Sequence, residues 1–120
     1  MIRIILAAAI AAAFGTVPAA QASSFRVVSD QNEFVQLVEG RNLTRFGIRL
    51  AVSSTGQIAG RAFGRAVTGA WKWQQGYFCR DLYFGRDDLG YNCQQVLVSG
   101  DTVRFISDQG SGEYADLRLR

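Results

Sequence analysis

The pattern of apolar and polar residues changes twice along the chain. An unbroken apolar run covers residues 4–14, directly after the single charge of Arg3. Further on, apolar residues recur at helical spacing only within residues 30–40. From Leu43 to the C-terminus they alternate with polar residues or glycine, which is typical of strands with one buried face. The pattern therefore predicts a leader, one helix and a mainly β remainder.

Residues 1–22 have the three parts of a cleavable secretory signal peptide. Arg3 supplies the positive charge, residues 4–14 the apolar stretch, and Ala20-Gln21-Ala22 the small-x-small pattern that signal peptidase accepts. A membrane-spanning helix needs about 20 apolar residues, so this run is too short for a permanent anchor. We expect cleavage after Ala22, a periplasmic or secreted protein without stable membrane insertion, and a single domain over residues 23–120.

Residues 30–40 predict the one helix of that domain. Asp30 is a suitable N-cap, and Phe34, Leu37 and Val38 fall on one helix face. Gly40 is a natural terminator. We expect this helix to cover one side of a sheet or to plug the end of a barrel.

The alternating region predicts seven short antiparallel strands joined by tight turns. They are expected over residues 43–52, 57–63, 66–74, 77–84, 91–98, 102–107 and 114–120. Connections this short favour a meander sheet or a small open barrel over parallel βαβ units. The expected fold class is mainly β, or α+β by strict count, with one N-terminal helix. Residues 110–115 match the dinucleotide pattern G-x-G-x-x-A, but a strand follows them, so we interpret them as a turn.

The two cysteines predict a disulfide. An even number of cysteines in an exported chain normally pairs, and a Cys79–Cys93 bond closes a loop of 15 residues. Such a loop contributes about 3 kcal/mol in the chain-entropy model. If the two cysteines face each other across a hairpin, Tyr83 faces Leu89, Asp81 faces Tyr91, and the chain turns through residues 84–88.

The composition excludes several kinds of chemistry. The chain has no histidine, so His-based triads are absent and the two cysteines make a poor zinc site. With both cysteines paired there is no thiol nucleophile. We expect no metal and no cofactor. Removal of Arg3 with the leader leaves 12 basic and 10 acidic residues, spread along the chain, and this balance does not indicate nucleic-acid binding.

The hairpin between the cysteines is the strongest candidate for a binding site. Its candidate residues are Arg80, Asp81, Tyr83, Arg86, Asp87, Asp88 and Tyr91. In one interpretation Arg80 and Arg86 hold a carboxylate or phosphate, and Asp87-Asp88 contributes to a calcium site. In the other, which we favour because charged turns are common, the turn is solvated and Arg80 and Asp81 make cross-strand pairs.

Trp71 and Trp73 are two residues apart, so in a strand they point to the same face. They either pack in the core, which is the usual role of aromatic residues in a small sheet, or line a barrel interior that binds a ligand. We favour the core.

Several runs of residues carry a resemblance to a known family. They are Leu43-Thr44-Arg45-Phe46-Gly47-Ile48, Val67-Thr68-Gly69-Ala70-Trp71-Lys72-Trp73, Gly76-Tyr77-Phe78-Cys79-Arg80-Asp81-Leu82-Tyr83 and Asp88-Leu89-Gly90-Tyr91-Asn92-Cys93-Gln94. In these runs the chain resembles a family of small, exported, uncharacterised bacterial proteins, which implies export but no established activity. Members are sometimes labelled dihydrodipicolinate reductase. That enzyme needs a nucleotide-binding βαβ unit, for which this chain has neither the motif in context nor the length.

Taken together, these features predict a non-enzymatic binding or interaction module of the bacterial cell envelope, whose partner is a protein or a small molecule. Two alternatives stay open. One is an inhibitor of an envelope hydrolase or peptidase, in which an exposed loop or terminus enters the cleft of the target. The other is an enzyme that uses Asp81, Asp87 or Asp88, which a buried carboxylate beside an open pocket would favour.

Overall fold

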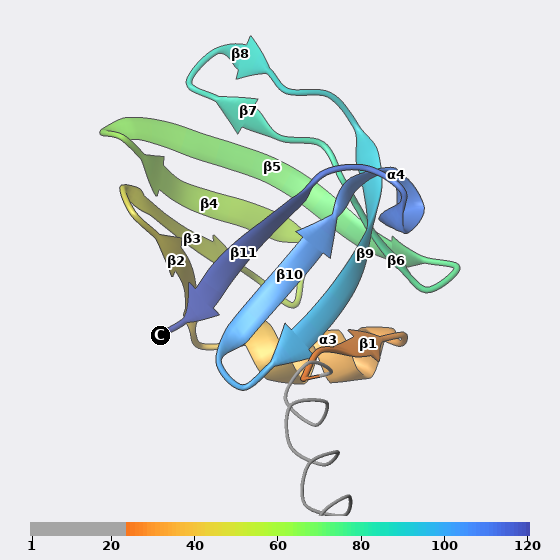
Figure 1. Ribbon diagram of the computed structural model, residues 1–120. Helices are drawn as coiled ribbons and strands as arrows, with labels where there is room; N and C mark the ends of the chain where they lie inside the picture. The colour runs from red at the N-terminus through yellow and green to blue at the C-terminus, as the bar shows by residue number, and fades with distance from the viewer. Residues whose placement is uncertain (1–23) are drawn as a thin grey trace, which may run out of the picture.

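The computed structural model describes residues 24–120, and the predicted signal peptide lies outside them. Within this range eight antiparallel strands form a closed barrel (Figure 1). In chain order they are β2 (Asn42–Arg45), β3 (Ile48–Val52), β4 (Gln57–Ala62), β5 (Arg65–Gln74), β6 (Tyr77–Arg80), β9 (Asn92–Ser99), β10 (Thr102–Ile106) and β11 (Tyr114–Leu119). Pairing of β6 with β9 closes the barrel, and pairing of β11 with β2 joins its two halves. The mainly β, antiparallel prediction is confirmed, and the barrel is closed rather than open.

The barrel has one strand more than the sequence predicts because residues 43–52 form two strands. β2 and β3 are joined by the two-residue turn Phe46-Gly47, with Arg45 opposite Ile48. Gly47 has φ +78°, a conformation that glycine adopts readily. Phe46 fits the same alternation as the inward-facing residues of β3. The alternating pattern therefore continues across the turn, and the sequence alone does not indicate that a turn is present.

The segment between the cysteines leaves the barrel as a small hairpin. Its strands are β7 (Tyr83–Phe84) and β8 (Asp87–Asp88), and β7 pairs with the first half of β5. Cys79 lies directly opposite Cys93, and the predicted disulfide is confirmed. The predicted pairing of Tyr83 with Leu89 is wrong. Tyr83 pairs with Asp88 because the hairpin turns in only two residues, and the extra residue is taken up between Asp88 and Cys93.

The predicted helix is present as α3 (Gln31–Val38) and covers one end of the barrel (Figure 1). The Asp30 side chain caps it by accepting a hydrogen bond of 2.9 Å from the backbone N–H of Glu33. Beside it, the short strand β1 (Arg26–Val28) pairs with β9. Phe34 and Val38 are buried, as the helical spacing predicts.

A second helical segment, α4 (Ser107–Gly110), was not predicted and lies toward the opposite end of the barrel (Figure 1). Its residues Asp108 and Gln109 have positive φ angles of 55° and 58°, so it is a turn more than a helix. The glycine-rich residues 110–115 lead from it into β11, in agreement with their interpretation as a turn.

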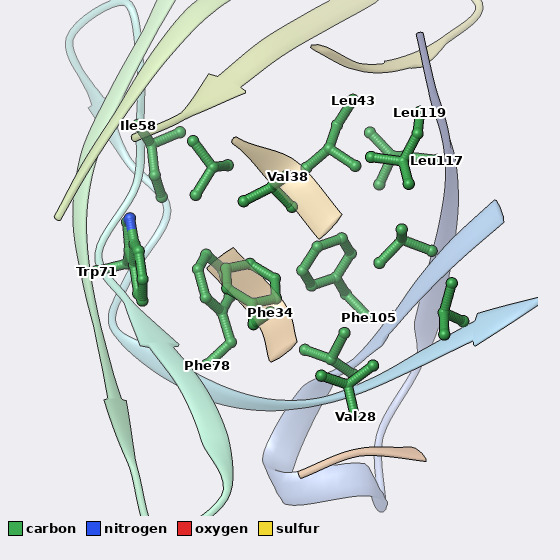
Figure 2. Close-up of a cluster of buried hydrophobic side chains, with 14 residues drawn as sticks. Val28, Phe34, Val38, Leu43, Ile58, Trp71, Phe78, Phe105, Leu117 and Leu119 are labelled. Carbon is green, nitrogen blue, oxygen red and sulfur yellow. The ribbon is translucent and has the colours of Figure 1, made fainter. Parts of the chain in front are cut away.

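The core is centred on the ring of Phe34, which enters the barrel from α3 (Figure 2). Its centroid lies 5.3 Å from that of Trp71, 5.1 Å from Trp73 and 5.0 Å from Phe78. The Trp71 indole donates a hydrogen bond of 2.9 Å to the carbonyl of Ser53. Trp71 is buried in this cluster and Trp73 packs against it. The helix is therefore a plug, and both tryptophans belong to the packing around it.

Candidate functional site

A cavity of about 180 Å³ lies inside the barrel. Phe78 and Phe105, which also contact the Phe34 cluster, form part of its wall, and the aliphatic side chains include Leu50, Leu82 and Leu117. Eight-stranded barrels are just wide enough to be filled by side chains or to hold one small ligand. This cavity is close in size to engineered apolar cavities of about 150 Å³ that bind benzene. It is therefore large enough for one ring or a short acyl chain.

Arg80 is the one charged residue on the cavity wall. It is half-buried and lies in register between Trp71 on β5 and Asn92 on β9. One of its guanidinium nitrogens donates a hydrogen bond of 2.8 Å to the carbonyl of Gly90. None of the ion pairs found among residues 24–120 includes Arg80.

The environment of Arg80 favours an anion. Burial lowers the pKa of Arg80, and the nearby charge of Asp81 acts in the opposite direction. An arginine nevertheless stays protonated in proteins, so a positive charge is held in a half-buried position. A guanidinium has five N–H donors in a planar fork that fits a carboxylate or phosphate. The N–H groups of Arg80 that do not bind the Gly90 carbonyl are therefore suited to an anionic group.

Gln94 adds a second polar group to the cavity wall and was not predicted. It is buried, lies opposite Phe78, and donates a hydrogen bond of 3.4 Å from its side-chain nitrogen to the hydroxyl of Ser107. The signal was present in the sequence, because Gln94 shares the alternation of Val96 and Val98, which are buried on the same strand. A polar residue on the apolar face of a predicted strand marks such a position.

A pair of hydrogen bonds ties α4 to the barrel near Gln94. The Asn92 side chain donates to the carboxylate of Asp108 at 2.8 Å and accepts from the Asp108 backbone N–H at 2.9 Å. Left-handed backbone in two successive residues other than glycine persists only where the surroundings support it. The reciprocal pair provides that support, and it keeps the segment after β10 close to the strand that carries Gln94.

The structure brings only some of the predicted residues together: Asp81 and Tyr91 line one surface pocket with Trp71, away from the other hairpin residues. Arg80 faces the cavity, whereas Tyr83, Arg86, Asp87 and Asp88 are exposed on the β7–β8 hairpin. Tyr91 is also exposed, and its hydroxyl donates a hydrogen bond of 3.4 Å to Gln74. Asp87 lies 3.7 Å from Arg65 in an exposed ion pair. Of the cluster proposed from the sequence, only Arg80 belongs to the cavity.

Asp81 has a structural role at the point where β6 gives way to β7. Its carboxylate accepts a hydrogen bond of 2.8 Å from the backbone N–H of Ala70, and its own N–H donates to the carbonyl of Ala70. Its backbone approaches Gly69 so closely that a side chain there would collide with the Asp81 carbonyl. Asp87 and Asp88 are exposed. Asp81 is half-buried and lines a surface pocket, but its carboxylate is engaged by the Ala70 N–H.

A second surface feature corrects the view that the basic residues are evenly spread. Residues 40–80 contain seven basic residues and no acidic one. On the folded barrel Arg45, Arg49, Arg61 and Arg120 line one shallow hollow on the outer surface. The absence of acidic residues from residues 40–80 was the feature of the sequence that could have predicted this basic surface. The contribution of Arg120 was not predictable, because it depends on the pairing of β11 with β2.

Comparisons of the chain with protein-family models, with curated proteins and with solved structures found no match. Within residues 24–120 neither helix has the length and hydropathy to cross a membrane. The functional assignment therefore depends on the geometry of the cavity and of the surface.

Proposed function

We propose that this protein is a non-enzymatic binding module of the bacterial cell envelope, which takes the apolar part of a small anionic molecule into its barrel. The observation that carries the proposal is an apolar cavity whose wall holds one half-buried guanidinium that forms no ion pair with any residue of 24–120. The predicted signal peptide and the disulfide support a periplasmic or secreted location. Membership of the small exported bacterial family that the sequence motifs resemble is part of this proposal.

The size and chemistry of the cavity narrow the class of ligand. Its volume of about 180 Å³ accommodates a single ring or a short acyl chain. Arg80 supplies donors for a carboxylate, and Gln94 supplies an amide for a further polar group. Charge-assisted hydrogen bonds are about twice as strong as neutral ones, so charge on the ligand contributes to affinity as well as orientation. We therefore propose a short-chain or aromatic carboxylate.

Native mass spectrometry of the unreduced protein recovered from its own envelope is the first test. A mass without residues 1–22 and without two hydrogens supports export and the disulfide. Additional mass of a small molecule supports a ligand. Additional mass of a whole protein instead supports the inhibitor alternative and contradicts the cavity as the main site.

Titration with benzoate and hexanoate, each against its neutral alcohol, tests the role of the charge. The wild-type protein is expected to bind the carboxylates about tenfold more tightly than the alcohols, which is the usual worth of a hydrogen bond to a charged group. Arg80→Gln removes this preference, whereas Arg86→Gln, on the exposed hairpin, retains it. Leu50→Trp fills the cavity and abolishes binding of both classes. Equal affinities in the wild-type protein and Arg80→Gln, or no binding at all, would overturn the proposal.

A further inference from the structure

Two phenylalanines are exposed at neighbouring hairpin tips. Phe46, in the β2–β3 turn, is 93% exposed, and Phe63, in the β4–β5 turn, is 64% exposed. The Phe63 N–H donates a hydrogen bond of 2.8 Å to the carbonyl of Gly47, so the two turns are in contact. Both tips lie at the end of the barrel away from α3 (Figure 1). A single exposed apolar residue is unremarkable on a protein surface, but two exposed aromatic side chains on contacting turns are typical of an interaction surface.

The backbone of Phe63 has a conformation that a bulky residue seldom adopts. Phe63 has φ +50°, the left-handed conformation that two-residue hairpins usually give to glycine, asparagine or aspartate. A bulky residue in this conformation is an outlier. Its ring lies against Gly47, where an added Cβ would come within 2.5 Å of it. Strain of this kind is found mainly at functional positions, and here it presents a ring to solvent.

The same end of the barrel carries unpaired positive charge. Arg45, Arg49 and Arg61 line the hollow that also includes Gly47. Arg49 and Arg61 are directly opposite each other on β3 and β4, an arrangement in which like charges destabilise a sheet. Among residues 24–120, none of the ion pairs involves these arginines. The described residues therefore present cations next to the aromatic tips, and none of these cations forms an ion pair, although Asp116 lies near enough to Arg45 to feel its charge.

We infer that this end of the barrel docks on the surface of a membrane that contains anionic phospholipids. Phe46 and Phe63 enter the boundary between head groups and acyl chains, and the arginines lie at the level of the lipid phosphates. Apolar side chains that insert beside cations bind anionic membranes through both contributions. A soluble polyanion would engage the arginines but would leave the two exposed rings without a role. The proposed contact is peripheral.

Flotation with vesicles tests this inference. Vesicles of phosphatidylglycerol and phosphatidylcholine are compared with vesicles of phosphatidylcholine alone, at low and high salt. The wild-type protein is expected to bind the anionic vesicles about tenfold more tightly, since each nearby cation contributes to attraction by an anionic surface. Salt is expected to weaken this binding, because it screens exposed charges. All variants share one N-terminus, so residues 1–22, if retained, contribute equally to each.

The variants are chosen so that unfolding cannot imitate the result. Phe46→Ser combined with Phe63→Asn removes both rings, and asparagine suits the left-handed turn, so the fold is retained. Vesicle affinity is expected to fall about tenfold or more, from the apolar area that no longer enters the lipid. Val27→Ser, an exposed apolar residue on β1 near α3, is the matched control and keeps full affinity.

A second pair of variants tests the charge. Arg49→Gln removes one cation from the hollow, so it is expected to weaken vesicle binding. It also relieves the repulsion between residue 49 and Arg61, so thermal stability is not expected to fall. Lys72→Gln removes an exposed charge that does not line the hollow, and it is expected to have a smaller effect. The inference is overturned if wild-type protein does not float with anionic vesicles. It is also overturned if the double phenylalanine variant binds like wild type, or if polyphosphate or duplex DNA binds with the same arginine dependence and displaces the vesicles.

Discussion

Arg104 and Asp116 face each other directly across β10 and β11 and are joined by two side-chain hydrogen bonds of 2.8 and 3.0 Å. The guanidinium also lies over the rings of Phe25 and Tyr114, at 4.1 and 4.0 Å from their centroids. A planar guanidinium is suited to hold a carboxylate in this bidentate way and to stack on aromatic faces at the same time. This cluster therefore links the start of the domain to its last two strands.

The pair predicts a specific dependence of stability on pH. The hydrogen bond from Arg104 lowers the pKa of Asp116, and the positive charges of Arg104 and Arg45 act in the same direction. A carboxyl with a lowered pKa in the folded state stabilises the protein fully above its unfolded pKa of about 3.9, and this stability is lost as the pH falls through the folded pKa. The melting temperature of Asp116→Asn should therefore lie below that of the wild type near neutral pH, by an amount that shrinks below about pH 4.

Thermal melts of both proteins across this range measure the difference directly. Asp87→Asn serves as the control, because Asp87 is exposed and forms only a long ion pair with Arg65, and it should change little at any pH. A difference between wild type and Asp116→Asn that stays constant down to strongly acidic pH would contradict the assignment.

Removal of the disulfide should lower stability by about 3 kcal/mol, the chain-entropy value for a loop of this length. Cys79→Ala combined with Cys93→Ala is preferable to serine, because Cys79 is buried and a hydroxyl there would need a partner. Urea unfolding of this variant and of the wild type measures the loss. Reduced wild-type protein should match the variant, and an unchanged unfolding midpoint in both would contradict a stabilising role.

Phe34→Ala should be the most damaging single change in the helix, because the ring is fully buried and contacts four other aromatic rings. The expected loss is about 3–5 kcal/mol. That loss is a large share of the stability of a small domain, so the alanine variant can fail to fold. Phe34→Leu leaves a smaller cavity and provides a measurable variant in that case. Leu89→Ala, at an exposed position, should stay within about 0.5 kcal/mol of wild type in urea unfolding.

The features that were predictable from the sequence depend on local patterns. The helix followed from the cap at Asp30 and the spacing of Phe34 and Val38, and the strands followed from alternation. The cysteine pair followed from the even number of cysteines in a chain with a predicted export signal. The turn at Phe46-Gly47 was missed because its residues continue the alternation of the next strand.

The candidate site depends on contacts that local patterns do not contain. Arg80 was singled out for its place between the cysteines, but its inward direction follows from its register with Trp71 and Asn92. Asp87 and Asp88 were grouped with it because they are close in sequence, whereas the β7–β8 hairpin carries them away from the cavity. Closure of the barrel decides which residues meet, and closure depends on strands far apart in the chain.

The disulfide lies in the middle of the pairing that closes the barrel. β6 and β9 share only three residue pairs, and Cys79–Cys93 is the central one. Without the disulfide the two strands share only these three residue pairs and their core packing, so the barrel is expected to open more readily in a reducing environment. In an oxidising environment the Cys79–Cys93 disulfide links β6 covalently to β9. The redox state of the surroundings therefore decides how firmly the barrel is closed.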